Sequence, residues 1–168
     1  MKKLILSIIF TTLTYLSYGQ SIFEKLEKWE TISSVVITKD AFEILSKFNI
    51  DFDDEENSEM EIFKMIDDLN ELRVYSTKNS LAAEEMGSLI TREVKSKKLT
   101  ELMKIKDGNS KVLIYVRSSK NKNFVDEVLM FVNGIEKKSK GRAESAIISL
   151  TGNIDINKLS KIADTFSN

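Results

Sequence analysis

The sequence predicts a single α+β domain, a mostly antiparallel sheet of about five strands with helices packed on it, preceded by a cleaved signal peptide. Short β-branched or apolar segments alternate with segments whose apolar residues recur at helical spacing. In the last third of the chain, apolar segments follow one another through short polar turns, which favours antiparallel pairing. The chain has 168 residues, 42% of them hydrophobic and 30% charged, which suits one domain with its own core.

The amino-terminal residues are typical of a secretory signal peptide. Two lysines stand at positions 2 and 3, residues 4–16 are apolar without a charge, and small residues at Ser17 and Gly19 precede Gln20. An uncleaved membrane anchor is the alternative, but the apolar run is short of the roughly twenty residues that span a bilayer. We expect removal of residues 1–19, a mature domain over residues 20–168 without a membrane span, and export to the periplasm or outside the cell.

The first half of the mature chain alternates between helical and extended patterns. Ser21 and Glu24 have the spacing of a capping box, and the β-branched residues of 33–38 favour a strand. The expected elements are a helix from Ser21 to about Trp29, a strand over 33–38, a helix over 40–48, an acidic loop over 51–59, a short helix over 60–66, a strand over 69–77 and a helix over 80–97. We expect Phe23 and Trp29 to lie on the buried face of the first helix.

The second half is dominated by apolar strands. The expected elements are a short helix over residues 99–107, strands over 112–116, 128–132 and 146–148, and a final helix that Asn153 or Asp155 caps and whose buried face includes Ile156 and Phe166. The apolar runs do not alternate with polar residues, so we expect both faces of the sheet centre to be covered. Either helices on both faces or a second subunit on one face would cover them.

The composition excludes several kinds of chemistry. The chain has no cysteine, histidine or proline, so disulfides, zinc–thiolate sites, cysteine nucleophiles and serine–histidine–aspartate triads cannot form within it. The 25 basic and 26 acidic residues balance, whereas nucleic-acid binding needs a basic excess. The acidic run at 51–59 lacks the glycine and final glutamate of a calcium-binding loop. We therefore expect no cofactor, no metal site and no nucleic-acid partner.

Three segments resemble an exported bacterial family known as domain of unknown function 4252. They are residues 99–106 (Leu-Thr-Glu-Leu-Met-Lys-Ile-Lys), 124–132 (Phe-Val-Asp-Glu-Val-Leu-Met-Phe-Val) and 147–156 (Ile-Ile-Ser-Leu-Thr-Gly-Asn-Ile-Asp-Ile). The leader and the strand at 33–38 are similar as well. The resemblance implies a small exported domain and assigns no catalytic residue.

Glu127 is the first candidate functional residue, because it interrupts an apolar strand. It could act as a general acid or base, but Asp126 points to the opposite face of a strand and cannot be its catalytic partner. The alternative is a strand-end glutamate paired with a lysine or an arginine. The second candidate is the segment with Gly152, Asn153 and Asp155, read as a turn between strand and helix. Such a turn can bind an anion through free amides, or the glycine can simply supply a positive φ.

The sequence supports three hypotheses on function. The leading one is an exported, soluble, non-catalytic binding or interaction domain, whose partner is a protein or small ligand of the cell envelope. The first alternative is a small hydrolase that uses carboxylates or a serine–lysine pair. The second is an envelope-stress accessory protein that forms an oligomer, which the doubly apolar strands motivate.

Overall fold

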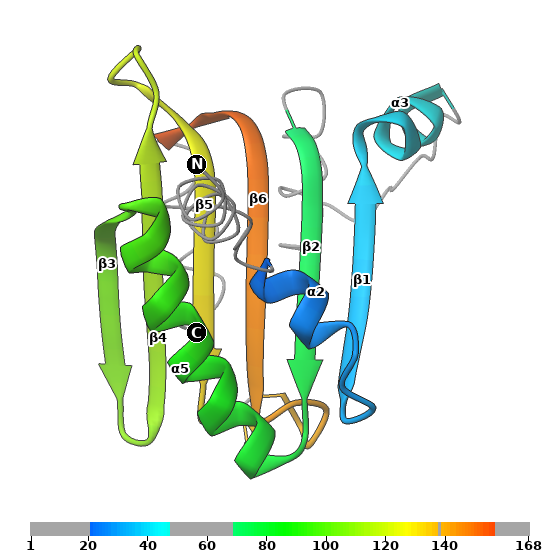
Figure 1. Cartoon of the computed structure of the whole chain (residues 1–168), viewed down its shortest axis with the longest axis vertical. Helices are drawn as coiled ribbons and strands as arrows, with labels where there is room; N and C mark the ends of the chain where they lie inside the picture. Colours follow the sequence, from blue (N-terminus) through cyan, green and yellow to red (C-terminus); the bar gives the residue numbers. More distant parts are fainter. Residues whose placement is uncertain (1–20, 48–68, 138, 157–168) are drawn as a thin grey trace, which may run out of the picture.

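A computed structural model describes residues 21–47, 69–137 and 139–156, and it confirms the α+β class as a single domain. Six antiparallel strands form one sheet in the order β1-β2-β6-β5-β4-β3 (Figure 1). The strands are β1 (Ile32–Thr38), β2 (Leu69–Thr77), β3 (Thr100–Asp107), β4 (Ser110–Ser118), β5 (Phe124–Asn133) and β6 (Ser145–Asp155), and the helices are α2 (Ile22–Leu26), α3 (Lys39–Lys47) and α5 (Ser80–Lys97). Among the described residues, no helix is long and apolar enough to cross a membrane.

Helix α5 has the limits that its sequence predicts, because local signals fix both ends. The Asn79 side chain accepts a hydrogen bond from the backbone N–H of Ala82 at 2.9 Å and caps the first turn. Lys98 ends the helix in the left-handed conformation, with a φ of 53°. Helix α2 begins where predicted, since the Ser21 side chain accepts from the N–H of Phe23. It ends at Leu26, earlier than the expected Trp29.

Both faces of the central strands are buried, as the unbroken apolar runs predict. Helices α2 and α5 lie across one face of the sheet (Figure 1), which we call the helix face. Its core contains Phe23, Met86, Leu129 and other buried residues of α2, α5 and the sheet. The opposite face, which we call the aliphatic face, has a separate core that includes Phe42 of α3 and strand residues such as Ile114.

The short helix predicted over residues 99–107 is wrong, because this segment is strand β3. Met103 and Ile105 are partly buried, while Lys104 and Lys106 between and after them are exposed. This alternation has the period of a strand, and pairing with β4 across a tight turn at Gly108 stabilises it. The spacing of Leu99, Leu102 and Met103 resembles a helical face only by coincidence, and it explains why five strands are expected and six are found.

The turn predicted at residues 151–155 is also wrong, because strand β6 continues to Asp155. Its neighbours hold this segment on both sides, with Thr151 opposite both Glu71 of β2 and Glu127 of β5. Gly152 has a φ of 146°, so the expected positive φ is present, but in a strand where both pairings shift register. The predicted loop over 51–59, the short helix over 60–66 and the final helix beyond Ile156 lie outside the described residues.

Candidate functional site

Glu127 lies inside the molecule, on the helix face of β5, and both of its carboxylate oxygens are engaged. The residue is only 3% exposed. Its Oε1 accepts a hydrogen bond from Lys97 Nζ at 2.7 Å. Its Oε2 accepts one from the guanidinium of Arg117, which is its direct partner on β4. The ion pair that a structural role for Glu127 requires is therefore present.

Lys97 joins Glu127 to a second buried carboxylate. Its Nζ lies 3.1 Å from Oε1 of Glu93, which stands one turn earlier on α5. The two carboxylates lie close together, because both bind the Nζ of Lys97. We call Glu93, Lys97, Arg117 and Glu127 the buried ion cluster. The name refers to the two buried carboxylates. The side chains of Lys97 and Arg117 are 31% and 48% exposed, and their positive charges compensate the two acids.

Phe23 of α2 connects the buried ion cluster to the centre of the sheet. Lys97 Nζ lies 5.4 Å from the centre of its ring, and the Arg73 guanidinium lies 5.1 Å from it. The ring also stacks on Tyr75, with centroids 5.6 Å apart. Cations close to an aromatic ring are attracted by its quadrupole. The Phe23 ring of α2 therefore attracts two positive side chains, Lys97 from α5 and Arg73 from β2.

A second polar group surrounds Arg73 on β2. Its Nε and one terminal nitrogen donate to the two oxygens of Glu71 at 2.6 and 2.9 Å, and this hydrogen bonding raises the pKa of the guanidinium. The Tyr75 hydroxyl donates to Glu27 at 2.8 Å. Burial raises the pKa of the Tyr75 phenol, which keeps its proton. These contacts join α2 to β2 as the buried ion cluster joins α5 to β4 and β5.

The contacts of the buried ion cluster hold helix α5 on strands β4 and β5. A general base needs a free oxygen toward a substrate, whereas both Glu127 oxygens are bound to cations. Neither of the grooves described below is lined by a member of the cluster. Within residues 21–47, 69–137 and 139–156, no group of three or more acidic side chains is placed to hold a metal ion.

The second predicted site is not assembled as an anion-binding turn. Gly152 is buried in β6, Asn153 is exposed, and Asp155 pairs with Phe124 of β5. The pairing continues beyond the register shift, with Gly152 opposite Leu69 of β2 and Ile154 opposite Val125 of β5, so this segment is a strand and not the start of a helix. Gly152 follows Thr151, the residue opposite Glu127. None of the candidate residues lines either of the grooves described below.

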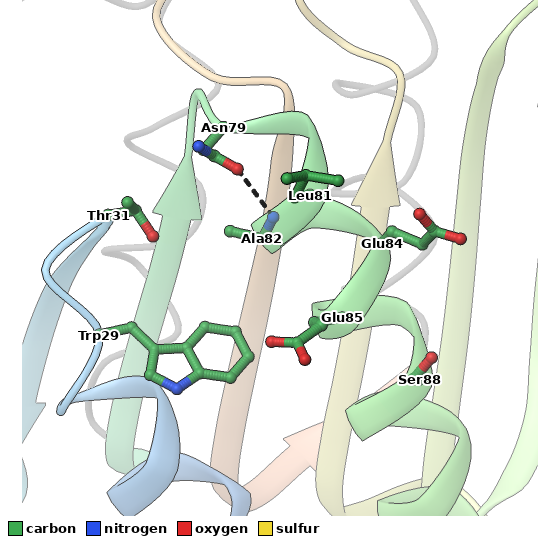
Figure 2. Close-up of a pocket in the computed structure, with 8 residues that line it drawn as sticks. All are labelled: Trp29, Thr31, Asn79, Leu81, Ala82, Glu84, Glu85 and Ser88. Atoms are coloured by element: carbon green, nitrogen blue, oxygen red, sulfur yellow. Dashed lines mark hydrogen bonds between the residues drawn. The ribbon is translucent and has the colours of Figure 1, made fainter.

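Sequence reasoning misses an open groove of about 600 Å³ beside the first turns of α5 (Figure 2). Its lining consists of Trp29, Thr31, Asn79, Leu81, Ala82, Glu84, Glu85 and Ser88. Figure 2 shows the Glu85 carboxylate pointing toward the Trp29 indole across the groove. Leu81 is 74% exposed, although it is a large apolar side chain. Leu81 and Trp29 therefore give an apolar part to a lining that is otherwise mostly polar and acidic.

The groove is acidic where Glu84 and Glu85 line it, and an adjoining hollow has side chains of both charges. A second hollow of about 300 Å³ shares Thr31 and Asn79 with it and is also lined by Glu30, Lys78 and Arg142. The sequence gives only a weak indication of this groove. Leu81 falls off the face that Ala82, Met86 and Leu89 bury, and the contribution of Trp29 depends on how the chain turns after α2.

Comparison with known proteins gives one finding. A family model described as "Domain of unknown function (DUF4252)" matches residues 25–162. No curated protein and no solved structure matches the chain. The match extends over both cores of the described fold, from α2 to the end of β6.

Proposed function

The chain belongs to the DUF4252 family, and from that premise we propose that it is an exported, non-catalytic binding domain. Its ligand is an extended segment of a partner protein of the cell envelope that carries basic and apolar side chains. The carrying observation is the groove in which exposed Leu81, the Trp29 indole and Glu85 stand together. The signal-peptide pattern of residues 1–19 supports the location.

The chemistry of the groove favours this ligand over others. Glu84 and Glu85 give the lining of the groove a negative charge, and Glu85 points toward the Trp29 indole (Figure 2). This charge attracts a lysine or an arginine. The indole face adds a cation–π contact for the same side chain. Leu81, which is 74% exposed, offers apolar area in the same groove. A segment that alternates basic and apolar residues satisfies both kinds of contact at once.

Trp29 provides a direct measurement, because it is the sole tryptophan of the chain. We expect a short peptide of alternating lysine and leucine to change its fluorescence in a saturable way. The same peptide with glutamate in place of lysine should have no effect. Glu85→Gln should weaken binding about fivefold, as expected for an exposed ion pair worth up to about 1 kcal/mol. Leu81→Ser should weaken it as well.

The matched controls lie on β3, at the far edge of the sheet. Glu101→Gln and Leu102→Ser change an exposed acid and an exposed apolar residue outside the groove and should leave binding unchanged. Equal affinity for both peptides would contradict the proposed ligand. Turnover of a hydrolase substrate that is lost in Glu127→Gln would contradict the non-catalytic role. Export is checked by sequencing the amino terminus of the protein from its native host, which should begin at Gln20.

A further inference from the structure

The two edges of the sheet differ in how they avoid pairing with other strands. An exposed edge offers unpaired N–H and C=O groups, and proteins protect it with charges, prolines or bulges. Strand β3 carries Lys104 and Lys106, and its pairing shifts register between Glu101 and Met103. Strand β1 has no charged residue and no proline, and it pairs with β2 in one unbroken register. Within the part of the chain that the structure describes, only the β3 edge carries such protection.

Exposed apolar side chains gather at the β1 edge and on the helix that follows it. Val35 and Val36 are 54% and 42% exposed, and as neighbours in a strand they lie on opposite faces. Ile44 of α3, the helix that follows β1, is 55% exposed. These are three of the five large hydrophobic residues that are exposed among the described residues. Figure 1 shows β1 at one side of the sheet, with no further strand beside it.

We propose that β1 pairs antiparallel with β1 of a second copy of this chain, which joins two sheets into one of twelve strands. A two-fold axis perpendicular to the sheet relates the copies, so paired residues must lie on the same face. An axis at Val35 meets this condition and places it opposite its own copy, with Ser34 opposite Val36 and Ser33 opposite Ile37. No charged residue lies between Ile32 and Thr38, so no like charges oppose each other.

The observations favour a second copy over other strands of the same protein. Pairing β1 with β3 would continue from copy to copy without closing, and it would set Lys104 and Lys106 against an uncharged strand. Pairing β1 with itself closes after two copies and removes the one unprotected edge from solvent. Helices α2 and α5 then lie on the same side of the joined sheet in both copies. The inference stands apart from the groove, whose residues are not part of this edge.

The absence of cysteine makes cross-linking a clear test. Val35→Cys places one thiol at the proposed axis, so mild oxidation should convert the protein to a disulfide-linked dimer. Leu102→Cys, on the other edge, should stay monomeric under the same conditions. Equal cross-linking of both variants, or none with Val35→Cys, would overturn the proposal.

Sedimentation provides an independent measurement that needs no new bond. The unmodified protein should shift from a monomer to twice that mass as its concentration rises. Val36→Lys should remain monomeric, whereas Leu102→Lys, at a residue with the same 42% exposure, should still dimerise. Circular dichroism verifies that both variants fold. A monomer at every concentration, or a dimer that Val36→Lys leaves intact, contradicts pairing through β1.

Discussion

The two faces of the sheet are both buried, but they are built from different kinds of residue. The buried residues of the aliphatic face are apolar, among them Ile114, Val128 and Met130. Every buried polar or charged residue among the described residues belongs to the helix face or to α5 itself. These residues are Thr77, Glu93, Glu127, Ser145 and Ser149.

The difference shows which part of the fold needs specific partners. An apolar core accepts substitutions that keep its volume, because its contacts are not directional. Buried charges accept only matched partners, since removing one leaves another uncompensated. The ion pair from Lys97 to the buried Glu127 therefore fixes how α5 lies on the strands. The pair from Arg73 to Glu27 is 26% and 43% exposed and contributes less. The aliphatic face contributes buried apolar area, and the helix face determines how the helices lie on the sheet.

Removing the shared ammonium group should have the largest effect. Lys97→Met leaves Glu93 without its partner and Glu127 with Arg117 alone. We expect a loss of about 3 kcal/mol in the free energy of unfolding, the low end for a broken buried pair because Arg117 remains. Urea denaturation measures it.

A matched control and a rescue variant separate this effect from a general loss of charge. Lys95→Met removes an exposed lysine from the same last turn of α5 and should change stability by less than about 0.5 kcal/mol. Adding Glu127→Leu to Lys97→Met should restore much of the lost stability, because the buried carboxylate is then gone. A double variant less stable than Lys97→Met would contradict this account.

A small cavity on the aliphatic face should cost less. Ile114 is buried there, and Ile114→Val removes one methylene, for an expected loss of about 1 kcal/mol by thermal or urea unfolding. Combined with Lys97→Met, the losses should add within about 0.5 kcal/mol, because the two residues lie on opposite faces without a shared partner. A larger coupling would show that the two faces are not independent.

The smallest effect concerns alkaline pH and belongs to the helix face. Burial raises the pKa of Tyr75 above its ordinary value of 10.0, and burial raises the pKa of Tyr115 in the same direction. The folded state therefore favours the neutral phenols. This contribution to stability is complete below pH 10 and is lost as the pH rises through the raised pKa values.

Phenylalanine substitutions isolate the phenols. Tyr75→Phe should make the alkaline fall in melting temperature shallower, and Tyr75→Phe with Tyr115→Phe should make it shallower still. Ser76→Ala, next to Tyr75 on β2, is the control and should leave the slope unchanged. A double phenylalanine variant with an unaltered slope would remove the phenols from the explanation.

Local signals allowed much of the fold to be predicted. Helix α5 follows from its periodic apolar face, and the strands of the last third follow from apolar runs separated by turns. The spacing of Leu99, Leu102 and Met103 does not predict strand β3. The alternation of Met103 and Ile105 favours a strand over a helix only through pairing with β4. A glutamate in an apolar strand predicts that Glu127 has a charged partner. It does not identify Lys97, which lies thirty residues away in sequence.

By itself, the sequence determined the α+β class, the paired strands β4, β5 and β6, and the absence of cysteine and histidine chemistry. These depend on composition and on neighbours along the chain. Only the tertiary structure decided which strands form the edges, where α5 meets Glu127, and that Trp29 and Leu81 line one groove. Those features depend on strand register and helix docking, which bring together residues far apart in sequence.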